Sequence, residues 1–495
     1  MTAVLFGLII ICISLLLAYL IRQYGRPPGY PPGPPWTPVV GNLPELRKLA
    51  KKFGGQYVAL WKLAKQYNTN VLGLKMGGDY VVTVFSYEVV KQVLLSEEFD
   101  GRPDNFFIKL RCFGARRGVT CTDGPLWKAQ RSFVTTHLKE LGFGRNTMES
   151  MIKEEVEGIL DYIRENSHDV QIGKLLAPSV INILWTFTSG TRINRDDPQL
   201  SKILDLLHER TRAFDMSGGT LSQHPWLRYI APEKTGYNLI QRINCDLKNL
   251  MVGTIKEHYN TWVYGKNEDL IYAYINEIKT ANGNKSVFSD DQLLLVCLDI
   301  FIAGAQTTSS TLDFLFLVMI LYPDIQKKVH YSIDNAFQKN ESISYQDRQR
   351  VSFIEAVILE VERYYAVVPI NGPRRVLRDT ELEGYHIPKD TTVLISLHSV
   401  HFDKDYWKDP EVFRPERFLD NEGNIHNKER VLTFGLGHRR CLGEILAKHA
   451  IFLIFVEVMR KYTISLWPGT KQPTGIPVPG ITITPEIYRA QFTPR

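Results

Sequence analysis

One short segment near the C-terminus constrains the fold of this chain more than any other. It reads Phe434-Gly-Leu-Gly-His-Arg-Arg-Cys-Leu-Gly443, and an apolar stretch that favours a helix follows it over residues 444–455. Glycine adopts backbone angles and allows close approaches that other residues forbid, so Cys441 is expected where a tight loop enters a helix. Amide groups at a helix N-terminus and the basic residues 438–440 favour a thiolate over a thiol. The segment therefore predicts a metal-ligating cysteine; a buried structural cysteine would not require this set of residues.

The composition suits one large globular chain in a reducing compartment. Of the 495 residues, 44% are hydrophobic and 23% are charged, which argues against disorder and against a multi-span membrane protein. The formal net charge of +6 suits an acidic partner or an anionic lipid surface, but it is too dilute to indicate nucleic-acid binding. The six cysteines include no Cys-x-x-Cys pair, so neither a disulfide framework nor a zinc cluster is indicated.

The N-terminal segment predicts a membrane anchor. Residues 3–21 carry no charge and are long enough to cross about 30 Å of hydrocarbon as a helix. A cleaved signal peptide is the weaker alternative, because no basic region precedes this stretch and the stretch is longer than usual. Arg22 and Arg26 follow it, which favours a cytosolic location for the remainder. We expect an anchor over residues 1–25, a stiff proline-rich hinge over 26–35 and one catalytic domain over 36–495.

The catalytic domain is predicted to be mainly α with small β-sheets. β-Branched residues alternate between turn residues over 71–84 and 375–397, which indicates short strands. Helical periodicity dominates elsewhere, for example over residues 353–361.

The longest apolar helix is predicted over Gln292–Tyr322. It would span about 45 Å, and its polar residues Asp299, Gln306 and Asp313 would be costly in lipid, so we expect a buried central helix rather than a second membrane span. Gly304 at its centre suggests that something approaches the backbone closely, either a ligand or a packed helix.

The glycine-rich segment resembles the haem-binding signature of the cytochrome P450 superfamily, and the whole chain resembles its microsomal class. The positions that match are Phe434, Gly437, Arg439, Cys441 and Gly443. The resemblance implies the cytochrome P450 fold, in which haem lies between a long central helix and the cysteine loop. It implies that Cys441 is the axial thiolate of a haem b iron, that Arg439 pairs with a haem propionate and that Phe434 packs beside the sulfur.

Matches far from the cysteine loop support the same resemblance. Trp127 and Arg131 lie one helical turn apart, as in the family's helix that reaches a haem propionate. Pro373-Arg-Arg375 is similar to the family's Pro-His-Arg segment, so Arg375 is expected to contact a propionate, although Arg374 replaces the usual histidine. The family also joins three residues in a buried structural network, which correspond here to Glu360, Arg363 and Arg417.

The centre of the long helix resembles the family's oxygen-activation motif. The motif residues are Ala303, Gly304, Gln306 and Thr307. By the resemblance, the small residues leave room for dioxygen and the Thr307 hydroxyl donates a proton and holds a relaying water. Gln306 stands where most members carry Asp or Glu, and because its amide cannot titrate, the protons must enter through water, Thr308 or another carboxylate.

The resemblance also implies an apolar substrate pocket. Its lining is expected to comprise Phe106, Phe107, Phe113, Ile302, Val367, Val368, Ile370 and Val478. A lipophilic ligand gains about 25 cal/mol per Å² on burial there, whereas a charged ligand finds no evident counter-ion.

Electrons must come from a partner, because the sequence contains no flavin or nicotinamide fingerprint. We expect an NADPH-dependent cytochrome reductase with an acidic docking face, and cytochrome b5 as a further donor. The expected contacts are Lys128, Arg440 and Lys448. The anchor and this partner together place the chain at the endoplasmic reticulum membrane.

The expected activity is that of a haem-thiolate monooxygenase acting on a lipophilic substrate. Length and the segment over 301–309 resemble most the insect members that epoxidise methyl farnesoate to juvenile hormone. Hydroxylation of other lipids, steroids or xenobiotics, an isomerase or dehydratase activity without dioxygen, and a carrier without turnover remain alternatives. A zinc site at His398 and His401 is a further alternative, but no third ligand accompanies this pair and the local pattern is strand-like.

Overall fold

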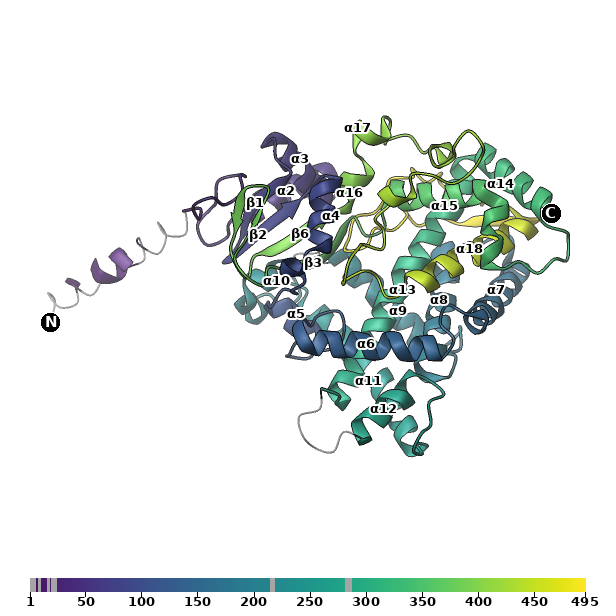
Figure 1. The fold of residues 1–495 in the computed structure, drawn as a ribbon, viewed down its shortest axis with the longest axis horizontal. Helices are drawn as coiled ribbons and strands as arrows, with labels where there is room; N and C mark the ends of the chain where they lie inside the picture. Colours follow the sequence, from purple (N-terminus) through teal and green to yellow (C-terminus); the bar gives the residue numbers. More distant parts are fainter. Residues whose placement is uncertain (1–5, 8–9, 16–17, 19–24, 214–218, 281–286) are drawn as a thin grey trace.

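Helices make up most of the fold, and three small sheets accompany them in the part of the chain that is described. The computed structural model describes residues 6–7, 10–15, 18, 25–213, 219–280 and 287–495. The predicted class, mainly α with small β-sheets, is confirmed (Figure 1). The α-helices are α2 (Leu43–Phe53), α3 (Gln56–Gln66), α4 (Tyr87–Leu95), α5 (Phe106–Arg111), α6 (Gly124–Glu140), α7 (Asn146–Asn166), α8 (Ile172–Ser189), α9 (Pro198–Ala213), α10 (Gly219–Gln223), α11 (Tyr237–Asn260), α12 (Leu270–Thr280), α13 (Asp290–Leu321), α14 (Pro323–Ala336), α15 (Ser352–Tyr365), α16 (Leu397–His401), α17 (Lys404–Trp407) and α18 (Glu444–Lys461).

Both regions predicted to contain strands do so. The largest sheet has the order β1-β2-β6-β3. Strands β1 and β2 pair antiparallel, β2 and β6 pair parallel, and β3 returns antiparallel to β6 with a register shift between Asn371 and Arg374. The strands are β1 (Val71–Met76), β2 (Asp79–Val84), β3 (Ile370–Arg375), β4 (Thr380–Leu382), β5 (Tyr385–Ile387), β6 (Thr392–Ser396), β7 (Tyr462–Leu466) and β8 (Ala490–Pro494). The antiparallel pair β7 and β8 at the C-terminus is an addition that the sequence pattern did not predict.

The proline-rich segment is packed onto the sheet. The Arg26 guanidinium donates to the carbonyl oxygens of Pro31 and Pro34, both at 2.7 Å. The Tyr30 hydroxyl donates to two strand carbonyls at 3.0 Å, and a Cβ on Gly33 would lie 2.2 Å from the carbonyl oxygen of Gly73. These contacts hold the segment extended against β1 and β2.

Helix α13 forms the centre of the helical part. Its N-terminus is capped by Ser289, whose side chain accepts a bond from the Gln292 amide at 3.3 Å. It packs against α8, α11, α15 and α18 and is mostly buried. Among the described residues it is the one helix long and apolar enough to cross a membrane, but about two-thirds of its most apolar window (67%) is buried inside the protein. The helix is therefore a core helix.

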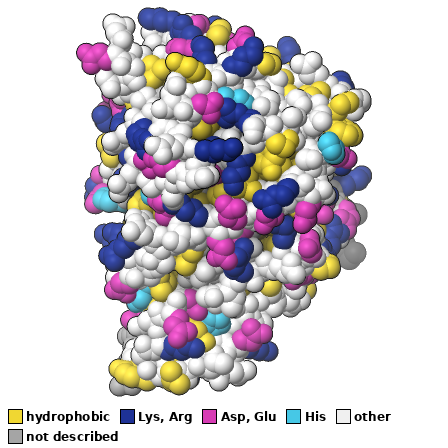
Figure 2. Space-filling model, turned by 90° about the vertical axis from the view of Figure 1, so that its right-hand side faces the viewer, with side chains coloured by type: hydrophobic (Ala, Val, Ile, Leu, Met, Phe, Trp, Pro, Cys, Tyr) yellow, Lys and Arg dark blue, Asp and Glu magenta, His cyan; other side chains and the backbone are white. Residues whose placement is uncertain are grey.

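The expected anchor over residues 1–25 lies largely outside the described residues. Those described there, 6–7, 10–15 and 18, are helical, and their large apolar side chains are exposed. On the face of the protein shown in Figure 2, Lys and Arg side chains are interspersed with Asp and Glu, which matches the modest net charge of +6.

Candidate active site

The segment around Cys441 forms a tight loop that leads directly into α18. Gly435 and Gly437 both have φ of 69°, in the left-handed region. A Cβ on Gly437 would lie 2.3 Å from the carbonyl oxygen of Leu94, so only glycine fits there. The Cys441 amide donates to the carbonyl oxygen of Phe434 at 2.9 Å, and Gly443 is the N-cap of α18. Cys441 thus stands at the entrance of a helix.

The electrostatics at Cys441 differ from the sequence-based expectation. Cys441 keeps exposed surface, but desolvation by the surrounding protein and then the Glu444 charge raise the pKa of its thiol in the chain alone, whereas the amides of Gly443 and Glu444 and the charge of Arg131 act in the opposite direction. The basic residues 438–440 do not supply the expected stabilisation of a thiolate, because each has another partner. His438 pairs with Asp100 at 2.9 Å, Arg439 donates to the Asp100 backbone and Arg440 pairs with Glu444 at 3.1 Å.

Three arginines with incomplete hydrogen bonding lie close to this loop. Arg102, Arg374 and Arg439 come from three distant parts of the sequence, and Arg374 and Arg439 are almost fully buried. Burial and mutual repulsion lower the pKa of Arg439 to about 8 and that of Arg374 to about 9. One buried nitrogen on each, Nε of Arg102, Nε of Arg374 and Nη1 of Arg439, has no hydrogen-bond partner among the described residues. Such a cluster is suited to an anionic group.

Trp127 and Arg131 of α6 adjoin this arginine cluster. The Arg439 guanidinium carbon lies 3.7 Å from the centre of the Trp127 ring, and Arg131 lies 5.8 Å from the same ring. Arg131 also donates to the carbonyl oxygen of Arg440 at 2.6 Å. Both residues therefore lie at the base of the cysteine loop.

Arg375 is engaged elsewhere. Its guanidinium pairs with Asp123 at 2.8 Å and with Asp390 at 2.6 Å, and it donates to the carbonyl oxygen of Arg102. The structure thus brings Arg102 and Arg374 to the unsatisfied cluster in place of the expected Arg375. Sequence reasoning missed Arg102, whose only signal was its position after Gly101 in a loop. The register shift in β3 lies next to Arg374, and no sequence pattern predicts it.

The centre of α13 borders an internal space. Ala303 is exposed although it lies in the middle of a helix that is mostly buried, so accessible volume must reach it from within the molecule. The Thr307 hydroxyl donates to the Ala303 carbonyl oxygen at 3.0 Å and keeps accessible surface. Gly304 instead meets α8, because a Cβ there would lie 1.8 Å from Cδ1 of Leu184.

Gln306 borders a separate cavity of about 370 Å³ between α8, α9, α13 and residues 484–488. The Thr211 hydroxyl donates to its side-chain oxygen. The same cavity contains Asp313, two helical turns further along α13, where burial raises the pKa of the carboxyl to about 7. A titratable group therefore lies on the helix that carries the non-titrating Gln306.

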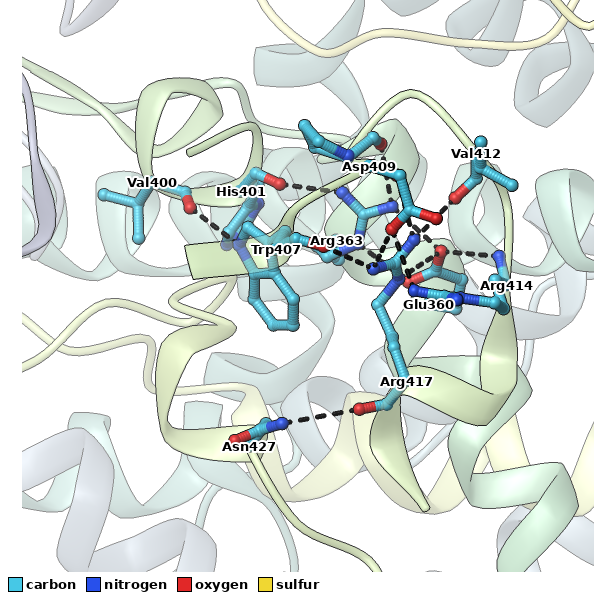
Figure 3. Close-up of polar contacts among 11 residues, drawn as sticks. Glu360, Arg363, Val400, His401, Trp407, Asp409, Val412, Arg414, Arg417 and Asn427 are labelled. Atoms are coloured by element: carbon cyan, nitrogen blue, oxygen red, sulfur yellow. Dashed lines mark hydrogen bonds and ion pairs between the residues drawn. The ribbon is translucent and has the colours of Figure 1, made fainter. Parts of the chain in front are cut away.

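Glu360, Arg363 and Arg417 form a buried network (Figure 3). Both oxygens of Glu360 accept bonds from Arg363, at 2.7 and 2.8 Å, and one also accepts from Arg417 at 3.0 Å. Other guanidinium nitrogens of the two arginines donate to backbone carbonyls, including that of His401 at 2.7 Å, and Arg417 also pairs with the Asp409 carboxylate at 3.2 Å. The His401 ring nitrogen Nε2 in turn accepts from the Leu432 amide at 3.0 Å, which connects the network to the start of the cysteine loop.

The two histidines considered for zinc have other roles. They lie in the short helix α16, so the strand-like interpretation of this segment is wrong. His401 Nε2 is occupied by the Leu432 amide, and the His398 ring packs against Tyr57 and Trp61 at centroid distances of 4.8 and 5.4 Å. Burial lowers the pKa of both to about 3.

The expected pocket residues divide into two groups. Phe107, Val367 and Ile370 are buried in the core. The others keep accessible surface: Phe106, Phe113, Ile302, Val368 and Val478. The Ile483 amide donates to the Val367 carbonyl oxygen at 2.9 Å, which joins the C-terminal turn to the segment after α15.

The expected reductase contacts lie on elements next to the cysteine loop. Lys128 is on α6, Arg440 is in the loop and Lys448 is on α18. Lys128 is exposed, and Arg440 and Lys448 both pair with Glu444 from exposed positions.

Comparison with known proteins agrees with this geometry. A family model described as cytochrome P450 matches residues 31–492. "Probable cytochrome P450 305a1" of Drosophila melanogaster is 42% identical over 505 residues and covers 100% of both chains. "Farnesoate epoxidase" of Bombyx mori is 34% identical over 490 residues, 99% of this chain and 98% of its own. "Cytochrome P450 2J2" of Homo sapiens is 31% identical, over 98% of this chain and 95% of its own.

These identities refine the resemblance. The sequence was expected to be most similar to the insect epoxidase, but its identity to the Drosophila protein is higher, 42% against 34%. The match to the family covers nearly the whole chain. The chain therefore belongs to the cytochrome P450 family and is a haem-thiolate monooxygenase.

Proposed function

We propose that this monooxygenase epoxidises the terminal double bond of methyl farnesoate, which gives juvenile hormone. The observation that carries the proposal is the 34% identity, along 99% of this chain, to the Bombyx mori protein whose name specifies farnesoate; the methyl ester is the part that we add. The apolar residues assigned to the pocket also support it, since a long isoprenoid chain gains free energy on burial against such side chains.

The residues near Cys441 fit the haem that the family requires. Cys441 at the entrance of α18 would ligate the iron. The three arginines with unpartnered buried nitrogens, Arg102, Arg374 and Arg439, would hold the propionates. Trp127 and Arg131 would flank them. When bound, the haem supplies dioxygen activation and transfer of one oxygen atom to the substrate.

The protein's own part in the reaction is to position groups and deliver protons. The Thr307 hydroxyl donates to the Ala303 carbonyl oxygen and can rotate to donate its proton into the internal space beside Ala303. Thr307 does not line the cavity bordered by Gln306 and Asp313, so a proton that returns from Asp313 to Thr307 Oγ1 would need a chain of waters along α13. The raised pKa of Asp313, about 7, suits a carboxyl that both accepts and releases protons near neutral pH.

The location and partners complete the proposal. Residues 1–25 would anchor the chain in the endoplasmic reticulum membrane, with the domain over 36–495 in the cytosol. Electrons would come from NADPH through a reductase that docks near Lys128, Arg440 and Lys448. Cytochrome b5 would be a further electron donor. The three basic side chains favour a partner with an acidic face.

Hydroxylation of another lipid is the second candidate. It is favoured by the apolar residues assigned to the pocket, which suit other lipophilic chains as well as an isoprenoid.

Mass spectrometry of reaction products tests the proposal. Membranes containing the protein and a cytochrome reductase are incubated with NADPH and methyl farnesoate, and separately with a fatty acid and a steroid. The proposal predicts the 10,11-epoxide from methyl farnesoate in a reaction that depends on NADPH. Turnover of the fatty acid or the steroid with no epoxide would contradict it and favour the second candidate.

A further inference from the structure

Arg210 is a partly buried cation that has no counter-ion among the described residues. It lies in the last turns of α9, and no hydrogen bond or ion pair joins its guanidinium to another residue among those described. Its side chain keeps some accessible surface. Desolvation is the main cause that lowers the pKa of its guanidinium to about 10. Arg210 therefore combines a largely desolvated position with accessible surface that a ligand can reach.

The charged and polar groups around Arg210 are already engaged with one another. The repulsion that it feels comes from Arg111, and the sulfurs of Cys112 and Cys121 lie nearby. Arg111 pairs with Asp299 at 2.8 Å and donates to the Cys121 sulfur at 3.0 Å. The second oxygen of Asp299 accepts two backbone amides, both at 2.8 Å. Both carboxylate oxygens of Asp299 therefore have partners already, and Arg210 is not one of them.

The position of Arg210 places it among the elements assigned to the substrate pocket. The neighbouring Thr211 donates to Gln306 on α13, and its carbonyl oxygen accepts from the Ile481 amide in the C-terminal turn at 2.9 Å. Arg111 ends α5, which contains two of the expected pocket aromatics. α9, α13 and the C-terminal turn therefore come together at Thr211, and Arg111 at the end of α5 is the charge that acts most strongly on the adjacent Arg210.

We propose that Arg210 binds the carboxylate of a lipophilic acid substrate. A guanidinium offers parallel N–H donors that match a carboxylate, and an unpaired cation at this depth is costly unless a ligand completes it. This inference rests on the proposed function, the epoxidation of an isoprenoid, and extends its substrate class from the methyl ester to the free acid, which it predicts to bind more tightly. It also corrects the expectation that a charged ligand would find no counter-ion.

Binding measurements on matched acids and esters test this proposal. The haem-loaded full-length protein in membranes is titrated with farnesoic acid, methyl farnesoate, dodecanoic acid and methyl dodecanoate, and Kd is read from the shift of the haem absorption band. We expect each acid to bind more tightly than its ester. Arg210→Gln should weaken acid binding by at least about tenfold and change ester binding by less than about twofold, and Arg210→Lys should fall between.

Lys202→Gln is the matched control, since it removes a positive charge from the exposed side of the same helix, where Lys202 pairs with Asp246. It should leave the acid-to-ester ratio unchanged, and all variants should keep the carbon monoxide absorption band that reports a folded haem site. Equal loss of acid and ester binding in Arg210→Gln, or no loss, would overturn the proposal.

The two proposals fail separately. Epoxidation of methyl farnesoate with no Arg210-dependent preference for acids leaves the proposed function standing and removes the role of Arg210. An Arg210-dependent preference for dodecanoic acid without turnover of either farnesoate compound supports the role of Arg210 and removes the proposed substrate.

Discussion

At the scale of single residues, the chemistry of the site depends on hydroxyl and guanidinium groups that have spare hydrogen-bonding capacity. The Thr307 hydroxyl bonds to its own helix at 3.0 Å but keeps accessible surface. Thr311, one turn later, makes the same kind of bond to the Thr307 carbonyl oxygen at 3.0 Å and is buried. The two threonines differ in access to the internal space, and this difference can be tested.

Replacement of Thr307 by Ala should reduce the product formed per NADPH consumed by about tenfold to a hundredfold, because a positioned proton donor is lost. Product and NADPH are measured in the same reconstituted reaction. Thr311→Ala is the control and should retain the wild-type ratio. A wild-type ratio in Thr307→Ala would show that its hydroxyl only caps the helix turn.

The residues proposed to hold the haem show what the sequence could predict at this scale. Cys441 and Arg439 were identifiable because their spacing within one short loop carries the signal. Arg102 and Arg374 were not, because their contribution arises only when a loop and an irregular strand meet the cysteine loop. The partners of Arg375, Asp123 and Asp390, are likewise set by folding.

At the scale of elements, the contact between α8 and α13 decides between two interpretations of Gly304. The sequence allowed either a close ligand or a packed helix. A Cβ on Gly304 would lie 1.8 Å from Cδ1 of Leu184, which favours the packed helix. Long periodic helices such as α13 and α15 were predictable, whereas the β7 and β8 pair was not, because its two strands are short and far apart in sequence.

Gly304→Ala should lower the free energy of unfolding by about 1 to 3 kcal/mol through overpacking. In the Leu184→Ala background the same change should cost less, since the space is then available. Urea unfolding of the wild type, the two single variants and the double variant gives the coupling free energy between Gly304 and Leu184. An unchanged stability of Gly304→Ala would contradict the packing role, and an activity loss that persists after stability is restored would point to the internal space instead.

The buried network around Glu360 should be needed to hold α15 and the segment before the cysteine loop together. Glu360→Gln leaves Arg363 without a carboxylate partner and Arg417 with only Asp409, which should cost about 3 to 5 kcal/mol and reduce the yield of haem-loaded protein. Glu416→Gln removes an exposed pair with Lys328 and should cost less than about 1 kcal/mol. Similar stabilities of the two variants would contradict the structural role of the network.

At the scale of the whole molecule, the N-terminal region has two parts with different roles. Residues 3–21 are apolar, whereas Arg26 and Tyr30 are tied to the folded domain by hydrogen bonds. The sequence indicated a stiff segment over 26–35, but its docking on the sheet depends on contacts with Gly73, Leu74 and Val81 that no local pattern reveals.

Removal of residues 1–25 should release the protein from membranes after a carbonate wash while it keeps its carbon monoxide absorption band. Removal of residues 1–35 should in addition lower the unfolding midpoint in urea, because the contacts of Arg26 and Tyr30 are lost. Membrane fractionation measures the release, and the absorbance during a urea titration measures the unfolding midpoint. Retention of the shorter deletion in the membrane pellet would contradict the anchor, and equal midpoints would contradict the docking of the segment.

The assignment of the thiolate to Cys441 is tested most directly by the absorption spectrum of the reduced, carbon monoxide-bound protein. Cys441→Ser should lose the absorption band of thiolate-ligated haem and should form no product. Cys245→Ser, at an exposed cysteine on α11, should keep both. A wild-type band and undiminished product in Cys441→Ser would contradict the assignment of the haem thiolate to Cys441.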